Sequence, residues 1–147
     1  MRARAAGVAL VLLMLASACS EPDHGPVRIV WGRHACDHCG MAINEQAFAA
    51  EVRVGPRDVM RFDDFGCAVA WLESQGGPSA ASEFWVMDAT RSEWIDARQA
   101  FYQPGQRTPM AHGFAAAQSR TPDNVDFETA RRTILERIRD RSSHERP

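Results

Sequence analysis

Short apolar stretches separated by polar residues predict extended strands in the first part of the chain. Residues 27–31 are largely apolar and indicate a first strand. Residues 49–54 and 59–62 are two further stretches of this kind. Between them lies Gly55-Pro56-Arg57-Asp58, whose composition is typical of a turn. These two stretches therefore predict a β-hairpin.

The apolar spacing changes to that of a helix directly after the hairpin. Apolar residues recur at helical intervals through residues 65–74, and a Gly-Gly-Pro sequence at 76–78 ends the segment. Asp63 or Asp64 is placed to cap the first turn. We therefore expect a helix here, packed on the sheet.

The second half of the chain repeats this alternation. Residues 83–88 predict a strand, and residues 94–102 predict a second extended run and part of a third. The alanine-rich residues 110–119 indicate a helix. Residues 126–141 carry a single apolar stripe, which predicts an amphipathic surface helix.

The succession of elements predicts α+β architecture, because hairpins and helices alternate without a parallel βαβ pattern. We expect two small, similar ββα-type lobes within one domain at 27–141, the first at about 27–77 and the second at about 83–141. The second lobe ends in the C-terminal amphipathic helix, and a polar tail follows at 142–147. The repeat rests on the pattern of elements, since no obvious sequence identity links the halves.

Composition fits a single folded domain. Of the 147 residues, 45% are hydrophobic and 24% are charged, which is ordinary for a globular protein. The net charge is −2, and basic and acidic residues are interspersed, so no broad basic face could follow a phosphate backbone. We therefore expect no nucleic-acid partner.

The first eighteen residues are typical of an export signal. Arg2 and Arg4 form a charged start, residues 7–15 are an unbroken apolar run, and residues 16–18 have small side chains. The apolar run is too short to remain as a membrane-spanning helix. We expect a signal peptide at 1–18 and a periplasmic mature protein.

Cys19 follows the signal at the position of a lipoprotein cysteine. The preceding Leu15-Ala16-Ser17-Ala18 is similar to the bacterial lipobox, although Leu15 lies one position too early. Acylation of Cys19 would provide several acyl chains and a stable membrane anchor, in either leaflet. Residues 19–26 would then be the lipidated N-terminus and tether. A free or disulfide-bonded Cys19 is the alternative.

The remaining cysteines indicate a soft metal site. Lipidation of Cys19 leaves Cys36, Cys39 and Cys67, an odd number that cannot pair off internally. The two-residue gap between Cys36 and Cys39 lets both sulfurs face one point, and Met41 adds a thioether close by. Thiolate and thioether donors together suit Cu(I).

Three alternatives to copper remain open. Structural zinc would need two further ligands from His34, His38, Cys67 and His112, and would leave Met41 without a role. A periplasmic Cys-x-x-Cys can also exchange disulfides, although the chain lacks the alternating βαβ pattern of thioredoxin-like proteins. A local disulfide between Cys36 and Cys39 would need no function at all.

A second group of candidate ligands lies far along the chain. Met110 and His112 are two residues apart, so in an extended segment their side chains would share a face and could approach one metal ion. We interpret Cys67 as a buried core residue, and expect His38 to point away from a metal held by its neighbours. The sequence contains no nucleophile–base motif, which favours a protein that is not an enzyme.

Four motifs, in order along the chain, resemble those of the NosL family of nitrous-oxide reductase accessory lipoproteins. They extend over most of the mature domain. The motifs are Cys36-Asp37-His38-Cys39-Gly40-Met41; Arg61-Phe62-Asp63-Asp64-Phe65-Gly66-Cys67; Trp85-Val86-Met87-Asp88 together with residues 94–102; and Met110-Ala111-His112-Gly113-Phe114-Ala115-Ala116.

The resemblance implies a membrane-anchored periplasmic Cu(I) chaperone that supplies copper to nitrous-oxide reductase or another copper enzyme. It also implies a two-lobed fold related to that of organomercurial lyase. A membrane ABC-type copper-maturation complex is a further expected partner. The family's ligands, carried onto this chain, fall on Cys36, Cys39 and Met41, with Met110 and His112 from the second lobe.

Overall fold

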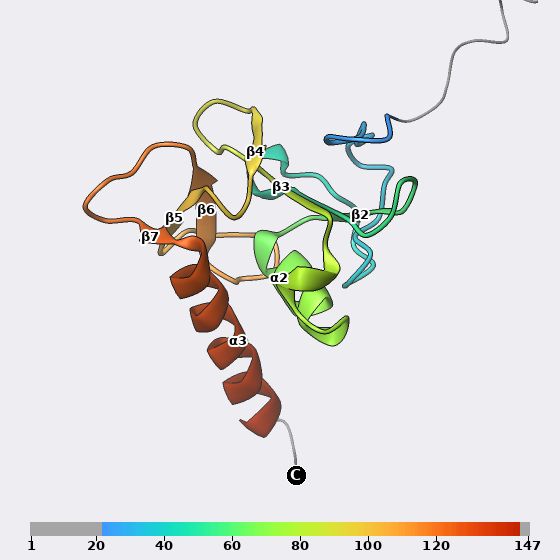
Figure 1. The fold of residues 1–147 in the computed structure, drawn as a ribbon. Helices are drawn as coiled ribbons and strands as arrows, with labels where there is room; N and C mark the ends of the chain where they lie inside the picture. The colour runs from blue at the N-terminus through green and yellow to red at the C-terminus, as the bar shows by residue number, and fades with distance from the viewer. Residues whose placement is uncertain (1–21, 145–147) are drawn as a thin grey trace, which may run out of the picture.

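In the part of the chain that the structure describes, two small antiparallel sheets and two α-helices form the fold. The computed structural model describes residues 22–144, and Cys19 with the predicted signal peptide lies outside them. One sheet has four strands in the order β2-β1-β3-β4, and the other has three in the order β6-β5-β7 (Figure 1). The elements are η1 (Gln46–Phe48), β1 (Ala50–Arg53), β2 (Val59–Phe62), α2 (Phe65–Ser74), η2 (Pro78–Ala80), β3 (Glu83–Met87), β4 (Trp94–Asp96), β5 (Phe101–Pro104), β6 (Phe114–Ala117), β7 (Val125–Asp126) and α3 (Phe127–His144).

The predicted α+β class is confirmed, and the sheets combine the halves of the chain. Strands β1 and β2 form the predicted hairpin, with Arg53 opposite Val59. Strand β3 then pairs with the other edge of β1, so the four-stranded sheet takes two strands from each predicted lobe. The three-stranded sheet and α3 lie wholly in the second half of the chain.

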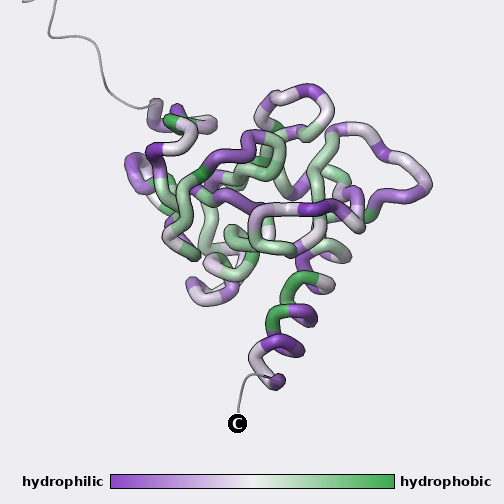
Figure 2. Tube along the Cα trace, turned by 180° about the vertical axis from the view of Figure 1, so that it is seen from behind, coloured by the Kyte–Doolittle hydropathy of each residue, from purple (hydrophilic) through white to green (hydrophobic). Residues whose placement is uncertain are grey.

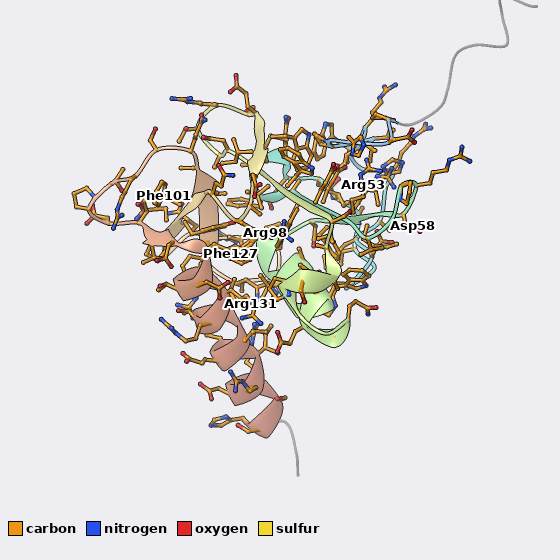
Figure 3. The ribbon with its side chains drawn as sticks, viewed as in Figure 1. Arg53, Asp58, Arg98, Phe101, Phe127 and Arg131 are labelled. Atoms are coloured by element: carbon orange, nitrogen blue, oxygen red, sulfur yellow. The ribbon has the colours of Figure 1, made fainter. Side chains whose placement is uncertain are left out.

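Four aromatic residues form the centre of the core. The rings of Phe65 and Tyr102 stack with centroids 4.2 Å apart, and Phe84 meets Phe127 edge to face at 5.9 Å. Phe127, labelled in Figure 3, lies at the start of α3. Since these residues come from α2, β5, β3 and α3, burying them joins both helices to both sheets.

Both strongly patterned helices form where the sequence predicts them. Helix α2 begins after Asp64, whose side chain accepts a hydrogen bond from the Gly66 N–H at 2.8 Å. Helix α3 buries Phe127, Ala130 and Ile134 on its apolar stripe. Hydrophobic and hydrophilic residues alternate along α3 in Figure 2, as expected of an amphipathic helix. Among residues 22–144, no helix has the length and apolar character needed to cross a bilayer.

The predicted helix at 110–119 is wrong. Residues 114–117 form strand β6, which pairs with β5 from Phe101↔Ala117 to Pro104↔Phe114. Ala111 and Gly113 have φ values of +56° and +84°, outside the helical region, so the chain cannot enter β6 as a helix. The helix propensity of alanine is overridden here by pairing with a distant strand.

The predicted strand at 27–31 is also wrong. Val27 and Ile29 are buried, as alternating strand residues would be, but this segment joins neither sheet. The Val27 N–H donates instead to Oε2 of the buried Glu51 at 2.8 Å, and a turn begins at Val30. The apolar pattern therefore reflects burial of these side chains without strand pairing.

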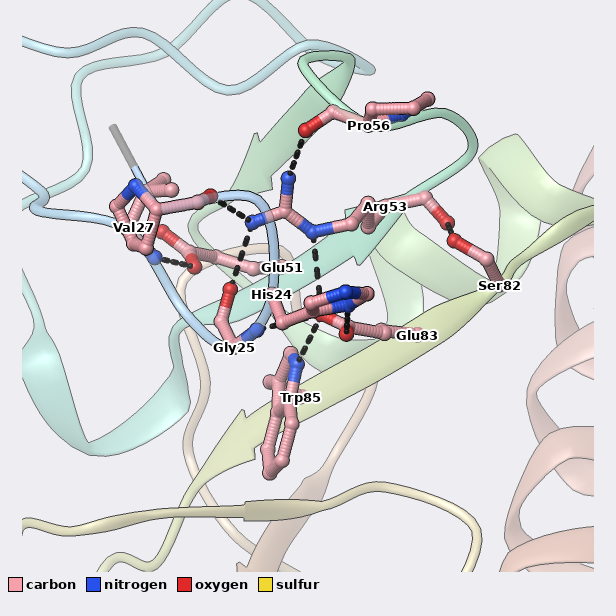
Figure 4. Close-up of polar contacts among 10 residues, drawn as sticks. His24, Gly25, Val27, Glu51, Arg53, Pro56, Ser82, Glu83 and Trp85 are labelled. Carbon is pink, nitrogen blue, oxygen red and sulfur yellow. Dashed lines mark hydrogen bonds and ion pairs between the residues drawn. The ribbon is translucent and has the colours of Figure 1, made fainter. Parts of the chain in front are cut away.

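The buried side chain of Arg53 holds the N-terminal segment against the sheet (Figure 4). Its guanidinium donates to the carbonyls of Pro22 at 3.1 Å and Gly25 at 2.8 Å, and to that of Pro56 at 2.7 Å. Its Nε pairs with Glu83 at 3.1 Å, and Glu83 also accepts the Gly25 N–H. Residues 22–26 are thus fixed to the end of the sheet where β1 and β3 place Arg53 and Glu83.

Replacing Arg53 with methionine should release this segment. We expect the free energy of unfolding to fall by about 3 kcal/mol, because three backbone carbonyls and Glu83 lose the buried side chain that donates to all of them. Urea denaturation measures the loss, and limited proteolysis near Gly25 should become faster. Arg57, exposed in the neighbouring turn, is the matched control, and Arg57→Met should change stability by less than about 0.5 kcal/mol. Equal effects of the two substitutions would contradict this role for Arg53.

Candidate metal centre

A short hairpin presents the first two cysteines. Ala35 and Ala42 form an isolated antiparallel bridge, the Cys36 N–H donates to the Met41 carbonyl at 2.8 Å, and the Gly40 N–H donates to the Cys36 carbonyl at 2.9 Å. Gly40 has a φ of +77°, a left-handed conformation that glycine adopts without strain. The loop closes on itself, and Cys36 and Cys39 turn toward the same side.

Strand β2 fixes this loop beside helix α2. The Asp37 N–H donates to the Arg61 carbonyl at 2.9 Å, and the Arg61 N–H donates back to the Asp37 carboxyl group at 2.6 Å. Directly after β2, Asp63 and Asp64 lead into α2, whose third residue is Cys67. The strand thereby brings Asp63 and Cys67 to the cysteine loop.

Three thiols and one carboxyl group meet at this point. Ligand atoms of Cys36, Cys39, Asp63 and Cys67 all lie within 4.8 Å of one another. Cys36, Asp63 and Cys67 are each at most 2% exposed, whereas Cys39 is partly accessible. The Cys39 thiol donates to both Asp63 oxygens at 3.6 Å. All three cysteines are free thiols, and their cluster can hold a metal ion.

Sequence reasoning missed two members of this cluster. Cys67 lies in α2 among apolar neighbours, as predicted for a core residue, yet its sulfur faces Cys36 and Cys39. The sequence predicts either Asp63 or Asp64 as the helix cap; in the structure Asp64 caps α2, which leaves Asp63 in the cluster. The odd number of thiols was the signal that could have assigned Cys67.

Asp64 also positions the second group of candidate ligands. One of its oxygens caps α2, while the other accepts the Thr108 hydroxyl at 2.6 Å and the Met110 N–H at 3.1 Å. Asp64 is fully buried, so these donors replace water as its hydrogen-bond partners. The loop that carries Met110 and His112 is thus held to the start of α2, next to Cys67.

Gly66 makes room for the imidazole of His112. A Cβ atom on Gly66 would lie 2.1 Å from Cγ of His112, so any side chain here would displace the ring. On its other side, the His112 carbonyl accepts from Arg137 Nη1 at 2.9 Å, and Nδ1 lies 3.4 Å from Arg141 Nη2. Helices α2 and α3 therefore hold His112 between them, 6% exposed.

An open pocket joins the two groups of candidate ligands. Its volume is about 350 Å³, and it includes Cys39 and Cys67 from one group and Met110 and His112 from the other. His38, expected to point away, also lines it. Met41 does not line this pocket, and it is 53% exposed to solvent. Among the described residues, the lining is His38, Cys39, Cys67, Met110, His112, Ile138, Arg141 and Ser142.

The three thiols differ in their tendency to ionise. A hydrogen bond from the Cys67 thiol lowers the pKa of Cys36 to about 6, against the opposing effect of burial. Burial raises the pKa of Cys39 to about 11, and hydrogen bonding to Cys36 and burial raise the pKa of Cys67 much further. At neutral pH one thiolate, Cys36, is thus ready as a metal ligand, and the other thiols must release protons on binding.

The imidazole of His112 is kept neutral. Burial lowers its pKa below the ordinary value of 6.5, and the positive charge of Arg141 lowers it further, while Asp64 acts in the opposite direction. Neutral imidazole is the form that binds metal ions.

The fold and the cluster define a small α+β protein with a sulfur-rich centre suited to a metal ion. Among solved structures, the chain is similar to the copper chaperone NosL from Shewanella denitrificans. The TM-score is 0.56, the identity is 19%, and the match covers 78% of this chain and 88% of that one. This likeness confirms the predicted NosL-like architecture at the level of the fold. No protein-family model and no curated protein matches the sequence.

Thiolate absorbance of the metal-free protein should titrate with a midpoint near pH 6, the pKa of Cys36. The signal should be lost below that pH, as Cys36 is protonated, and should be absent between pH 5 and 8 in Cys36→Ser. Cys67→Ala removes the hydrogen-bond donor and should move the midpoint toward the ordinary value of 9.0. Ultraviolet absorbance against pH measures each variant. An unchanged midpoint in Cys67→Ala would contradict the assigned donor.

Gly66→Ala should destabilise the protein although it adds alanine to a helix. At an open helix position this change stabilises by about 0.5–1 kcal/mol. Here the clash with His112 should reverse the sign and cost about 1–3 kcal/mol. Denaturant unfolding measures both effects. In His112→Gly the ring and the Cβ, which would lie 2.4 Å from the added atom, are both absent, so adding Gly66→Ala should cost much less than in the wild type, and an equal loss in both backgrounds would refute the contact.

Proposed function

We propose that the protein binds Cu(I) as cargo in this centre and delivers it to a copper enzyme. The observation that carries the proposal is the convergence of Cys36, Cys39 and Cys67 beside a pocket that contains Met110 and His112. Thiolate, thioether and imidazole together form a soft donor set, which favours Cu(I) over hard cations. The likeness to a copper chaperone of the same fold supports this reading.

The arrangement of donors supports transfer rather than permanent storage. Cys36 is buried and lies outside the pocket lining, whereas Cys39 and Cys67 line the pocket. A recipient's ligands can therefore approach from the pocket while the thiols still hold the ion. Met110 and His112 lie along this approach and would bind the ion on its way in or out.

We further propose export to the periplasm and lipid anchoring at Cys19. The fixing of residues 22–26 by Arg53 supports an anchored orientation, because Arg53 and the metal centre lie at opposite ends of the sheet. Arg53 pairs with the first residue of β2, whereas Asp63 follows the last residue of β2, roughly 13 Å from the first. The pocket would then face away from the membrane, toward a periplasmic recipient.

The recipient we propose is nitrous-oxide reductase or another copper enzyme, and a membrane ABC-type maturation complex is a further proposed partner. Both follow from the resemblance of the four sequence motifs to the NosL family. Incubation of Cu(I)-loaded protein with copper-free nitrous-oxide reductase, followed by metal analysis of each protein, tests the transfer. Retention of all the copper by this protein would argue against that recipient.

Geometry disfavours disulfide exchange and structural zinc. A thiol–disulfide enzyme needs an accessible thiolate, but Cys36, whose pKa is lowered, is 2% exposed. A structural zinc site is a closed tetrahedron of ligands, whereas this cluster opens into a pocket with further donors. If zinc were structural, chelation would unfold the domain, so a thermal melt after chelation distinguishes the two.

Anaerobic competition titration should show one Cu(I) bound per chain. Cys36→Ser and Cys39→Ser each remove a thiolate and should weaken binding by more than the roughly 10- to 100-fold that loss of an outer partner costs. Cys67→Ser, Met110→Leu and His112→Gln should also weaken it. Of the variants that remove a sulfur atom, Met41→Leu should reduce the affinity for Cu(I) least, because Met41 lies outside the pocket lining. Full affinity in Cys36→Ser would refute the proposed site.

A further inference from the structure

Arg141 is hydrogen-bonded to the imidazole nitrogen of His112 that a metal ion would need as a ligand. Its Nη2 lies 3.4 Å from Nδ1 of the imidazole, and both side chains line the pocket. Arginine stays protonated and has no acceptor, so in this contact the guanidinium donates and Nδ1 accepts. Nδ1 therefore carries the lone pair of the neutral ring, and the proton is on Nε2.

This contact blocks both ways in which His112 could bind a metal ion. Binding through Nδ1 requires the lone pair that Arg141 engages. Binding through Nε2 requires the ring proton to move to Nδ1, where two N–H groups would then face each other. In either case Arg141 has to leave, and its exposed position in the last turns of α3 allows it to do so.

The loop itself does not need to move for this exchange. Arg137, one turn earlier in α3, holds the His112 carbonyl at 2.9 Å, and Gly66 leaves space for the ring. Asp64 binds the same loop through Thr108 and Met110. The loop is thus held by Arg137 and Asp64, and among residues 22–144 Arg141 is the hydrogen-bond partner of the His112 Nδ1 atom.

We propose that Arg141 competes with Cu(I) for His112, and thereby weakens the binding of Cu(I) there and speeds its release. The inference rests on the proposed copper function and assigns a regulating residue to the same site. When the ion binds, the guanidinium swings into solvent; when the ion leaves, Arg141 returns to Nδ1. Return of Arg141 offsets part of the loss of the metal–imidazole bond, so release to an acceptor is faster.

Arg141→Gln should bind Cu(I) about 3- to 10-fold more tightly than the wild type, the size expected for loss of one charge-assisted hydrogen bond at an exposed side chain. Most of this gain should appear as slower release to a Cu(I) chelator in stopped-flow measurements. Arg139 is the matched control, because it lies two residues away on α3 and lines the adjoining groove instead of this pocket. Arg139→Gln should leave both quantities unchanged.

A double-mutant cycle with His112 separates competition from simple charge. In His112→Ala the competition is absent, so adding Arg141→Gln should not change affinity. Equal tightening in both backgrounds would show a general effect of charge and overturn the inference, as would no tightening in the wild-type background. Circular dichroism of every variant establishes that α3 remains folded.

Imidazole NMR of the metal-free protein tests the contact without copper. We expect the His112 proton on Nε2, and an Nδ1 resonance that shifts in Arg141→Gln but not in Arg139→Gln. A proton on Nδ1 in the wild type would overturn the inference. If the wild type bound no Cu(I), the proposed function would fail, and this spectrum would still decide whether Arg141 occupies Nδ1.

Discussion

The buried carboxyl group of Asp64 joins the two parts of the chain from which the candidate site is built. One of its oxygens starts helix α2, and the other binds Thr108, 44 residues further along the chain. These contacts determine where Cys67 lies relative to Met110 and His112. A fully buried carboxyl group without these donors would be costly, so the loop has few alternative positions.

The adjacent residues Asp63 and Asp64 have different roles. Asp64 is used entirely in holding the fold together, which leaves Asp63 to contact the Cys39 thiol. Cys67, three residues later, has a buried sulfur that supports the Cys36 thiolate. One strand-to-helix connection therefore provides a helix cap, a carboxyl group and a thiol within five residues. Gly66 completes it by leaving space for His112.

Helix α3 connects stability to the proposed chemistry. Its first turns bury Phe127 and Ala130 in the core, while Arg137 and Arg141 in its later turns reach the His112 loop. The exposed side chain of Arg141 can move without disturbing the aromatic core, because the buried residues of α3, Phe127, Ala130 and Ile134, lie in its N-terminal half.

Features that depend on neighbouring residues could be predicted from the sequence alone. Local turn composition and apolar spacing predict the β1–β2 hairpin, helix α2 and helix α3. The two-residue gap between Cys36 and Cys39 predicts that their sulfur atoms lie close together. Features that depend on distant partners could not. Residues 114–117 form a strand because they pair with β5. Residues 27–31 form no strand, and the Val27 N–H donates to Glu51 and not to a neighbouring strand.

The candidate site shows the same limit. Residue spacing identified two groups, Cys36 with Cys39 and Met110 with His112, and the family resemblance predicted that they share one site. The tertiary structure places Cys39 in one pocket with Met110 and His112. It also turned the Cys67 sulfur toward the loop and left Met41 exposed. Local spacing fixes which residues can act together within a turn. Burial and hydrogen bonds between distant segments determine which of these local groups lie together in the folded protein.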